Sequence, residues 1–448
     1  MLKKLQILVL LVTITAQSQQ TVTGTINPIN TDYTWAALYQ LKGAKQIYVD
    51  NVNFENEKFS IVFPENSPSG MYRLRFKMDN QSTIDIIYNQ KNIELKLDPS
   101  KPFETVDFIT SEENIIYHKY VQKTNAIKQN LDAIQYTYFK MKTEAEKAEA
   151  RISYQNVLLY YKEIQQEFEV NSEGMLASHF IKSNEKYYAE KLFENPQEYL
   201  NSEKTHFFEY INFTDPVIIN SNVITQAVLD YTFYLNASDD VEVQQKLYKN
   251  AIDTVLAKVS DNNLLKSEIV NTLLYAFSQS ENLTITDYLQ ENYYENLPAE
   301  YKNDEDINNI LENLKIAIGR TAPDFTFNIN GETNSLHNLN TAKTYVLVFW
   351  STECSHCIDE VPKLYDYMLN KTNVQVIDIG LENSNVEFEK YAEKFEKWIS
   401  VLGLGKWENS ISKNYNIVST PTYFILNEAK TIIEKPEYIE DVKAYFEN

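Results

Sequence analysis

Residues Thr344 to Pro362 read T-Y-V-L-V-F-W-S-T-E-C-S-H-C-I-D-E-V-P. The run from Tyr345 to Trp350 is β-branched and aromatic, which is the composition of a buried strand. Three polar residues follow, and the segment from Cys354 to about Asn370 has helical spacing. The stretch therefore predicts a strand, a short turn and a helix whose first turn carries two cysteines.

This order places the first cysteine where a thiolate is most stable. At a helix N-terminus, unpaired backbone N–H groups and the positive end of the helix dipole lower the pKa of a thiol. We therefore expect Cys354 to be the nucleophile. Cys357, one turn further along, is expected to attack the mixed disulfide formed by Cys354 and to release the reduced partner. The chain contains two cysteines in total, and both lie here, which favours redox chemistry.

A single C-x-x-C pair has other uses. A zinc site needs about four ligands, and the sequence offers no second Cys or Cys/His pair. Haem attachment needs a histidine directly after the second cysteine, where Ile358 stands. We therefore expect no metal and no cofactor, and a structural disulfide or a metal site remains the alternative to a redox dithiol.

The N-terminus has the pattern of an export signal. Met1-Leu2-Lys3-Lys4 is positively charged, Ile7 to Ile14 is a short apolar core, and Ala16-Gln17-Ser18 is a cleavage region of small residues. The apolar core is too short to span a bilayer. We expect residues 1–18 to be a signal peptide and the mature protein to reach the periplasm or cell envelope, with no lipid anchor evident. The alternative is a buried N-terminal strand.

The composition bounds the number of domains and the partners. A chain of 448 residues is long enough for two or three domains. Its formal net charge of -22 argues against nucleic acid or anionic membranes as partners.

Residues 19–105 have β character. Short alternating segments are separated by Asn, Gly and Pro, and they predict a small antiparallel β-sandwich. The expected strands are 21–26, 33–41, 47–52, 59–63, 72–77, 83–88 and 93–97. The patterns V-x-G-x-I and F-S-I-V-F-P…G-M-Y-R-L-R-F resemble a domain of unknown function that often precedes thioredoxin-like domains in exported bacterial proteins.

Residues 106–317 are expected to form an α-helical region. Apolar residues at helical spacing mark two long helices that form a hairpin, and Thr143-x-x-Glu146 is a capping box between them. The histidines here, His118, His179 and His206, lack the spacing of metal ligands.

The last segment, 318–448, carries a specific resemblance. Gly319 to Phe325 reads G-x-x-A-P-D-F, and Phe349 to Pro362 follows the pattern F-W-x-x-x-C-x-x-C-x-x-E-x-P. Together with the S-T-P-T loop at 419–422, these motifs resemble the TlpA/ResA-like thiol-disulfide oxidoreductases. Peroxiredoxins share the first motif, but Leu347 stands where their proline would be. The resemblance implies a C-terminal α/β thioredoxin-like domain, in a chain that is multidomain overall.

The resemblance also implies roles for individual residues. Glu360 would relay protons or tune the thiols, while Trp350 and Pro421 would shape the site. Pro421 is expected to be cis and beside the dithiol, which leaves the backbone of Thr420 available to an extended client segment. His356 occupies the place of a histidine found in strongly oxidising DsbA-like proteins.

Two residues depart from the family pattern, His356 and Glu353. Glu353 stands immediately before Cys354, and its negative charge would oppose thiolate formation if the side chain pointed inward. After the dithiol, residues 374–381, 422–426 and 431–434 are expected as strands, and residues 387–398 and 439–446 as helices.

The expected activity is disulfide reduction or exchange in extracytoplasmic protein clients, with electrons from a membrane-bound donor. Two alternatives remain. One is a DsbA-like thiol oxidase with the same fold, and the other is a binding protein whose thioredoxin-like domain is a redox-inert scaffold.

Overall fold

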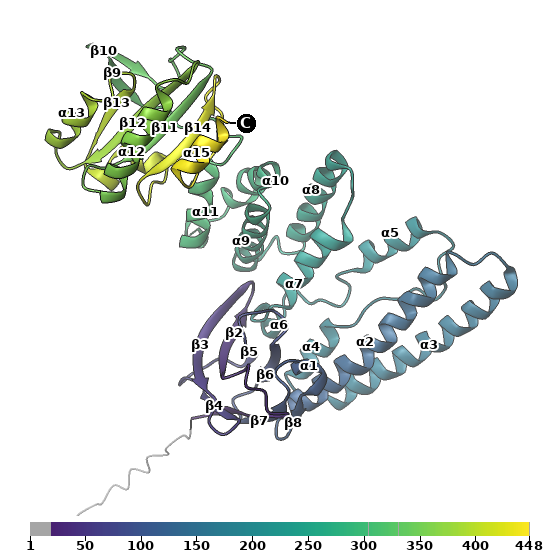
Figure 1. Ribbon diagram of the computed structural model, residues 1–448. Coiled ribbons are helices and arrows are strands. Elements are labelled where there is room, and N and C mark those ends of the chain that lie inside the picture. Colours follow the sequence, from purple (N-terminus) through teal and green to yellow (C-terminus); the bar gives the residue numbers. More distant parts are fainter. Residues whose placement is uncertain (1–18, 303, 330, 448) are drawn as a thin grey trace, which may run out of the picture. The chain divides into compact units, whose positions relative to one another are not determined.

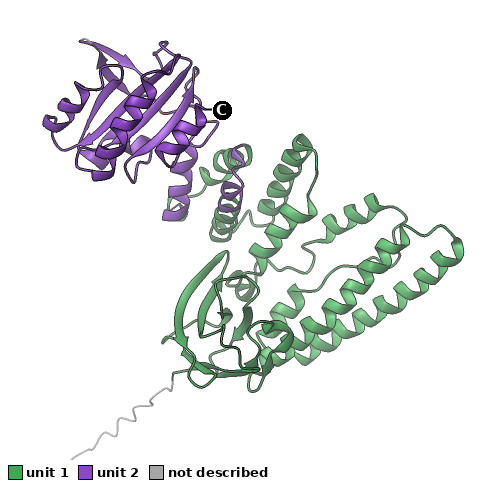
Figure 2. Cartoon of the chain, viewed as in Figure 1, with its two compact units in different colours: residues 1–274, 284–301 green, residues 275–283, 302–448 purple. Residues whose placement is uncertain are grey.

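The computed structural model describes residues 19–302, 304–329 and 331–447, so the expected signal segment 1–18 lies outside the described residues. These residues form two compact units (Figure 2). Unit 1 contains the described residues up to 274 together with 284–301. Unit 2 contains residues 275–283 and the described residues from 302 onward.

Unit 1 begins with two four-stranded sheets. One has the order β4-β1-β7-β8 and the other the order β3-β2-β5-β6 (Figure 1). Alternate apolar side chains of both sheets meet in one buried cluster that includes Val22, Leu38, Ile61 and Leu74. The strands are β1 Thr21–Ile26, β2 Trp35–Lys42, β3 Lys45–Asn53, β4 Lys58–Val62, β5 Gly70–Arg75, β6 Thr83–Tyr88, β7 Ile93–Leu97 and β8 Asp107–Phe108.

The expectation of purely antiparallel sheets is wrong. β1 pairs with β4 in the antiparallel sense but with β7 in the parallel sense, with Val22 opposite Ile93 and Ile26 opposite Leu97. These residues are about 70 positions apart in the chain. Strand direction at that separation is set by the path of the intervening chain, which the alternation of side chains does not encode.

Helices follow the sheets along the chain. The Thr143–Glu146 capping box is present, since each residue bonds the other's backbone at the start of α3. None of the helices within the described residues is long and apolar enough to cross a membrane. The helices are α1 Pro102–Thr105, α2 Glu112–Tyr138, α3 Glu144–Asn171, α4 Ala177–Ser183, α5 Pro196–His206, α6 Pro216–Ile219, α7 Val223–Leu229, η1 Asp230–Leu235, α8 Val241–Ala257, α9 Asn263–Gln279, α10 Leu283–Leu289, η2 Gln290–Tyr294, η3 Ala299–Tyr301 and α11 Glu305–Lys315.

Unit 2 contains a five-stranded sheet of order β13-β12-β11-β14-β15. β11, β12 and β13 are parallel, whereas β14 and β15 are antiparallel to their neighbours. Its elements beyond α11 are β9 Thr326–Ile329, β10 Glu332–Ser335, β11 Thr344–Trp350, α12 Ser355–Met368, β12 Val374–Glu382, α13 Val386–Ala392, β13 Ile399–Leu404, η4 Lys406–Glu408, α14 Ser410–Asn414, β14 Thr422–Asn427, β15 Ile432–Glu434 and α15 Ile439–Tyr445.

The central strand β11 is buried on both faces. Val346, Val348 and Trp350 pack with the apolar face of α12 and with α15, while Tyr345, Leu347 and Phe349 contribute to a second cluster on the opposite face. Burial on both faces explains the continuous apolar run, because a strand covered on one face alone would alternate with polar residues. The strand ends at Trp350, and this fixes where the following loop and helix begin.

The expected helix over 387–398 is too long. α13 ends at Ala392, and β13 starts at Ile399 as an unexpected edge strand. Phe388, Phe395 and Trp398 have helical spacing and all reach the cluster beneath α12. The spacing suggested one continuous helix, but the turn after Ala392 keeps the same side chains buried.

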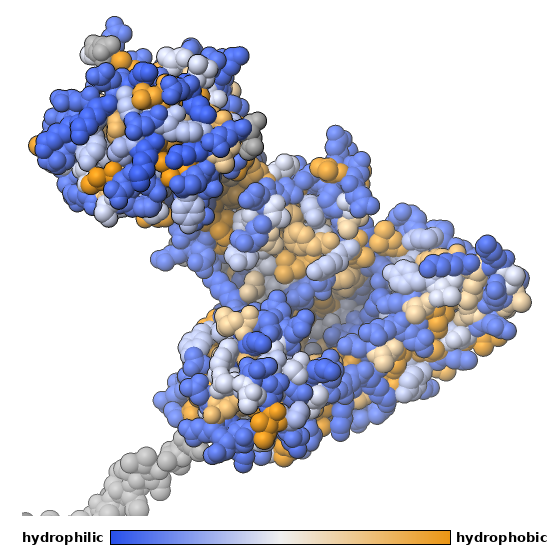
Figure 3. All heavy atoms as spheres, viewed as in Figure 1, coloured by the Kyte–Doolittle hydropathy of each residue, from blue (hydrophilic) through white to orange (hydrophobic). Residues whose placement is uncertain are grey.

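The outer face of each unit is mainly hydrophilic in the view of Figure 3, with scattered apolar side chains. This matches an acidic chain that has its apolar residues gathered in separate cores.

Candidate functional site

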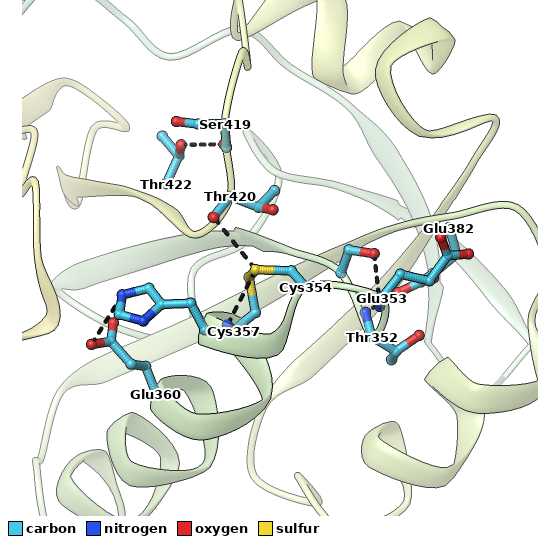
Figure 4. The surroundings of a disulfide bond; sticks show 11 residues. Thr352, Glu353, Cys354, Cys357, Glu360, Glu382, Ser419, Thr420 and Thr422 are labelled. Atoms are coloured by element: carbon cyan, nitrogen blue, oxygen red, sulfur yellow. Dashed lines mark hydrogen bonds and ion pairs between the residues drawn. A yellow bond between two sulfur atoms is a disulfide. The ribbon is translucent and has the colours of Figure 1, made fainter.

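The two cysteines lie at the start of α12, as the sequence predicts. Cys354 is the N-cap residue, and its Sγ accepts a hydrogen bond from the backbone N–H of Cys357 at 3.2 Å. The two form a disulfide with 5.2 Å between their Cα atoms (Figure 4). Cys357 is fully buried, whereas Cys354 is partly exposed. One sulfur is therefore accessible to a partner and the other is held behind it.

The loop before the helix has its own local bonds. Ser351 closes a turn, because its carbonyl oxygen accepts from the N–H of Cys354 at 3.1 Å and its Oγ accepts from the N–H of Glu353 at 3.2 Å. This turn delivers Cys354 to the helix N-terminus directly after β11.

A second loop reaches the dithiol from the start of β14. The Thr420–Pro421 peptide bond is cis, as expected. The carbonyl oxygen of Thr420 lies 3.5 Å from Cys354 Sγ, and Thr422 Oγ1 donates to the carbonyl of Ser419 at 2.7 Å (Figure 4). The fold thus brings together residues 66 positions apart.

Glu360 lies one turn beyond Cys357. Its side chain is 15% exposed, and its Oε1 lies 3.3 Å from Nε2 of the exposed His356. Its Oε2 is buried without a hydrogen-bond partner among the described residues. The Tyr423 hydroxyl is also buried, and burial, together with the charge of the nearby Glu360 carboxylate and its contact with the hydroxyl, raises the pKa of Tyr423. His356 is therefore close to Glu360, and a buried carboxylate oxygen belongs to the dithiol helix itself.

Trp350 is buried in the cluster that contains Cys357. Its indole N–H donates to Asp378 on β12 at 3.2 Å, and Ser400 Oγ donates to the other carboxyl oxygen at 2.6 Å. Asp378 is fully buried, and burial raises its pKa to about 7 against the lowering effect of these two hydrogen bonds.

The charge of Glu353 is paired outside the site. Its Oε2 lies 2.5 Å from Nζ of Lys406, in the turn after β13, and the Glu353 side chain is 60% exposed. The negative charge of Glu353 is therefore balanced by Lys406 and does not face the two cysteines unpaired.

A buried carboxylate also binds the loop that carries Cys354. Glu382, the last residue of β12, is 3% exposed, and its Oε1 accepts from the N–H of Thr352 at 2.5 Å (Figure 4). Its carbonyl oxygen accepts from the N–H of Gly405 at 2.9 Å. Glu382 thus joins the loop that carries Cys354 to the turn that carries Lys406.

Sequence reasoning did not identify Asp378, Glu382 or Lys406. The first two had a signal, since an acidic residue inside a buried apolar strand needs a hydrogen-bond partner. Lys406 had none, because it lies 53 residues from Glu353 in an irregular segment.

Comparisons with known proteins found several similar sequences. A sequence model of the AhpC/TSA family matches residues 318–435. Thiol-disulfide oxidoreductase ResA of Geobacillus kaustophilus is 26% identical over 147 residues, which cover 32% of this chain and 83% of that protein. The thioredoxin-like protein YneN of Bacillus subtilis is 31% identical over 119 residues, which cover 25% of this chain and 68% of that protein.

A solved structure is similar to part of the chain. It is a domain of a possible thiol-disulfide isomerase from Cytophaga hutchinsonii, with 28% identity, coverage of 29% of this chain and 90% of that one, and a TM-score of 0.26. Its C-terminal segment matches the family model and both curated relatives. Through this segment, the chain belongs to the family of thioredoxin-like thiol-disulfide oxidoreductases.

Proposed function

We propose that the protein is an exported thiol-disulfide oxidoreductase that reduces or exchanges disulfides in extracytoplasmic proteins through Cys354 and Cys357. The observation that carries the proposal is the unequal exposure of the two sulfurs at the N-terminus of α12. An accessible nucleophile in front of a buried partner is the arrangement that a two-step exchange requires.

The first step is attack by the Cys354 thiolate on one sulfur of a client disulfide. A bond forms between Cys354 Sγ and that sulfur, the client disulfide breaks, and the other client sulfur leaves as a thiolate. The backbone N–H of Cys357, 3.2 Å from Cys354 Sγ, stabilises the attacking anion.

The second step is attack by Cys357 on Cys354. The Cys357 thiol gives up its proton, its sulfur bonds to Cys354 Sγ, and the remaining client sulfur leaves as a thiolate. Two electrons have then passed from the dithiol to the client. Glu360 is the proposed proton acceptor, because its largely buried carboxyl group lies three residues after Cys357 on the same helix.

Clients are proposed to lie along the Thr420–Pro421 loop. The Thr420 carbonyl already faces Cys354 at 3.5 Å, so an extended segment bound there would bring its disulfide against the accessible sulfur. His356 and Trp350 are proposed to act indirectly, the first through Glu360 and the second through packing on Cys357.

The export pattern of residues 1–18 supports a location in the periplasm or cell envelope. Each reduction leaves Cys354 and Cys357 as a disulfide, so turnover needs two electrons and two protons from outside. We assign this supply to a membrane-bound donor.

The parts before residue 318 are proposed as separate modules, with residues 19–105 as a β-sandwich and residues 106–317 as a helical region. The shared apolar core of the two sheets supports the first. The long α2–α3 hairpin supports the second.

Insulin reduction by the mature chain, with dithiothreitol as the recycling reductant, tests the proposal. We expect turnover that disappears in Cys354→Ala, and Cys357→Ser should accumulate mixed disulfides with clients. If the wild-type chain turned over insulin no faster than Cys354→Ala, the enzymatic proposal would fail and the redox-inert scaffold would remain. Alkylation of the two thiols in cells then separates a reductase, mostly thiol, from an oxidase, mostly disulfide.

A further inference from the structure

Unit 1 contains a cavity of about 510 Å³ that lies entirely among its own elements. Its walls come from β5, β6, α2, the segment after α4, α5, α7 and the start of η1 (Figure 1). The volume is within the range of small-molecule sites, and the lining mixes apolar with ionisable side chains. The apolar part includes Met71, Phe207, Ile211 and Val223.

Lys128 of α2 is the unusual group in this lining. Its Nζ donates to two oxygens of Asn184, the backbone carbonyl and, at 2.8 Å, Oδ1. Both oxygens are neutral, and among the described residues no carboxylate lies within ion-pair distance of Nζ. Burial, and to a smaller extent the charge of Lys186, lower the pKa of Lys128 to about 8 against the opposing effects of Glu185 and Asp132. An ammonium group in such a place lacks a counter-ion.

Two of the carboxylates around the cavity are already paired. Asp85 accepts two hydrogen bonds from Arg73, at 2.6 and 2.8 Å. Glu203 lies 3.0 Å from Nζ of Lys186, which also pairs with Asp132 at 3.0 Å. Lys186 is thus shared by two carboxylates, and none of the carboxylates named here lies within ion-pair distance of Lys128 Nζ.

The other two carboxyl groups of the lining have raised pKa values. Burial raises the pKa of Glu185 to about 7, and Glu169 adds to the rise while Tyr210 opposes it by hydrogen bonding. Burial also raises the pKa of Asp230, which accepts from Gln226 at 2.9 Å. Glu185 is therefore only partly ionised near neutral pH.

The remaining basic group of the lining also has a partner. His206 Nδ1 lies 2.5 Å from Glu209 Oε2, and its ring stacks on Tyr187 with 3.7 Å between centroids. Lys128 is thus the one cation of this lining, within the described residues, that has no carboxylate partner.

We propose that the cavity binds a small organic carboxylate with an apolar body, such as a peptide C-terminus or a free amino acid, and that Lys128 is its counter-ion. The carboxylate of the ligand accepts a hydrogen bond from the Lys128 ammonium group. Without the ligand, this group donates to neutral oxygens alone. Phe207, Ile211 and Val223 contact the apolar body. The site is independent of the dithiol and gives unit 1 a recognition role.

The proposal predicts the direction of a pH dependence. Affinity is highest where Lys128 is charged and Glu185 is protonated, and it falls as pH rises through about 7 to 8 because the cation is lost and a competing anion forms. Lys186 and its two carboxylate partners, Asp132 and Glu203, are the further charged groups near Lys128.

Calorimetric titration of the mature chain with N-acetyl-alanyl-phenylalanine tests the site. We expect saturable binding of the free acid at pH 6.5, at least tenfold weaker binding of the C-terminal amide, and a similar loss in Lys128→Met. Lys119→Met, an exposed lysine on the same helix, is the matched control and should bind as the wild type does. Binding of free phenylalanine as well assigns the cavity to amino acids, and binding of the acetylated acid alone assigns it to peptide ends.

A second readout does not depend on the folding of a variant. Lys128 of the wild type should acetylate readily at pH 8, and the free acid, but not the amide, should protect it, as measured by peptide mass spectrometry. Equal binding of acid and amide, no binding of either at 10 mM, or an unprotected Lys128 would overturn the proposal.

Discussion

The indole N–H of Trp350 donates to Oδ2 of Asp378 at 3.2 Å, which joins two neighbouring strands inside the core beneath the dithiol helix. Ser400 on β13 donates to the other oxygen, so one buried carboxyl group links three strands. Because that group is fully buried, its ionised form is the costly one, and its pKa rises from 3.8 to about 7.

Stability should therefore fall as pH rises from about 4 to above 7, because the folded state holds a proton that the unfolded state has lost. Between pH 5 and 8, ionisation of Asp378 should lower the free energy of unfolding of the wild type by about 2 to 3 kcal/mol. Asp378→Asn should remove that loss. The measurement is urea unfolding followed by tryptophan fluorescence, and three of the four tryptophans lie in unit 2.

The exposed Asp359→Asn is the control for this comparison and should keep the wild-type pH dependence. An equal loss of stability between pH 5 and 8 in wild type and Asp378→Asn would show that Asp378 does not titrate in this range.

The Glu353–Lys406 pair should affect the reactivity of Cys354. Lys406→Met leaves the Glu353 carboxylate unpaired beside the N-cap sulfur, which disfavours the thiolate. Because the pair is partly solvated, we expect iodoacetamide alkylation of reduced Cys354 at pH 7 to slow by roughly two- to fivefold. The effect should shrink in 1 M salt.

Lys390→Met serves as the control here, since it breaks a similar exposed pair, with Glu387, on α13. If both variants alkylate at the wild-type rate in low salt, the Glu353 charge has no influence on the dithiol.

Glu382 should act as a positioning residue, because its side-chain oxygen accepts a hydrogen bond from the loop that carries Cys354. A glutamine at this position keeps such an oxygen, and an alanine does not. Glu382→Ala leaves the Thr352 N–H without its 2.5 Å partner in a buried place. We expect a stability loss of about 1 to 3 kcal/mol and slower insulin reduction. Glu382→Gln keeps an oxygen acceptor and should stay close to wild type in both assays. Similar losses in both variants would mean that the negative charge, rather than the hydrogen bond, is what matters.

Local features of this fold were predictable from the sequence. The strand ending at Trp350, the helix opening at Cys354 and the Thr143–Glu146 cap each depend on residues within a few positions of one another. Propensity, capping and burial on both faces act at this range, so the residue pattern alone fixes them.

Features that join distant segments were not predictable from the sequence. The parallel pairing of β1 with β7 and the Glu353–Lys406 pair each depend on how the intervening chain folds back. β13 was hidden for another reason, since Phe388, Phe395 and Trp398 imitate a helical stripe while the chain turns between them.

The buried Oε2 of Glu360 predicts a role in the second step of exchange. Glu360→Gln should leave attack by Cys354 nearly unchanged but slow release of the client, because Cys357 loses its proton acceptor. The measurement is the decay of a mixed disulfide with a labelled peptide, followed from pH 6 to 9. The defect should diminish at high pH, where hydroxide removes the proton.

His356→Gln is the control for this prediction. It removes the exposed partner of Glu360 without touching the carboxylate, so it should have the smaller effect on release. A wild-type decay profile in Glu360→Gln would reduce Glu360 to a packing residue.

Exposed apolar side chains beside the dithiol predict how clients bind. Val418, two residues before Thr420, is 83% exposed, and Ile358, next to Cys357, is 37% exposed. Val418→Asp should raise the KM for insulin several-fold, because an extended client loses apolar contact and meets a charge, while reduction of a small disulfide such as oxidised glutathione stays the same. Val386→Asp, on α13, introduces the same charge at another exposed apolar position of unit 2 and should change neither rate. Equal loss with both disulfides would show that Val418 supports the loop rather than the client, because a small disulfide does not need the apolar surface.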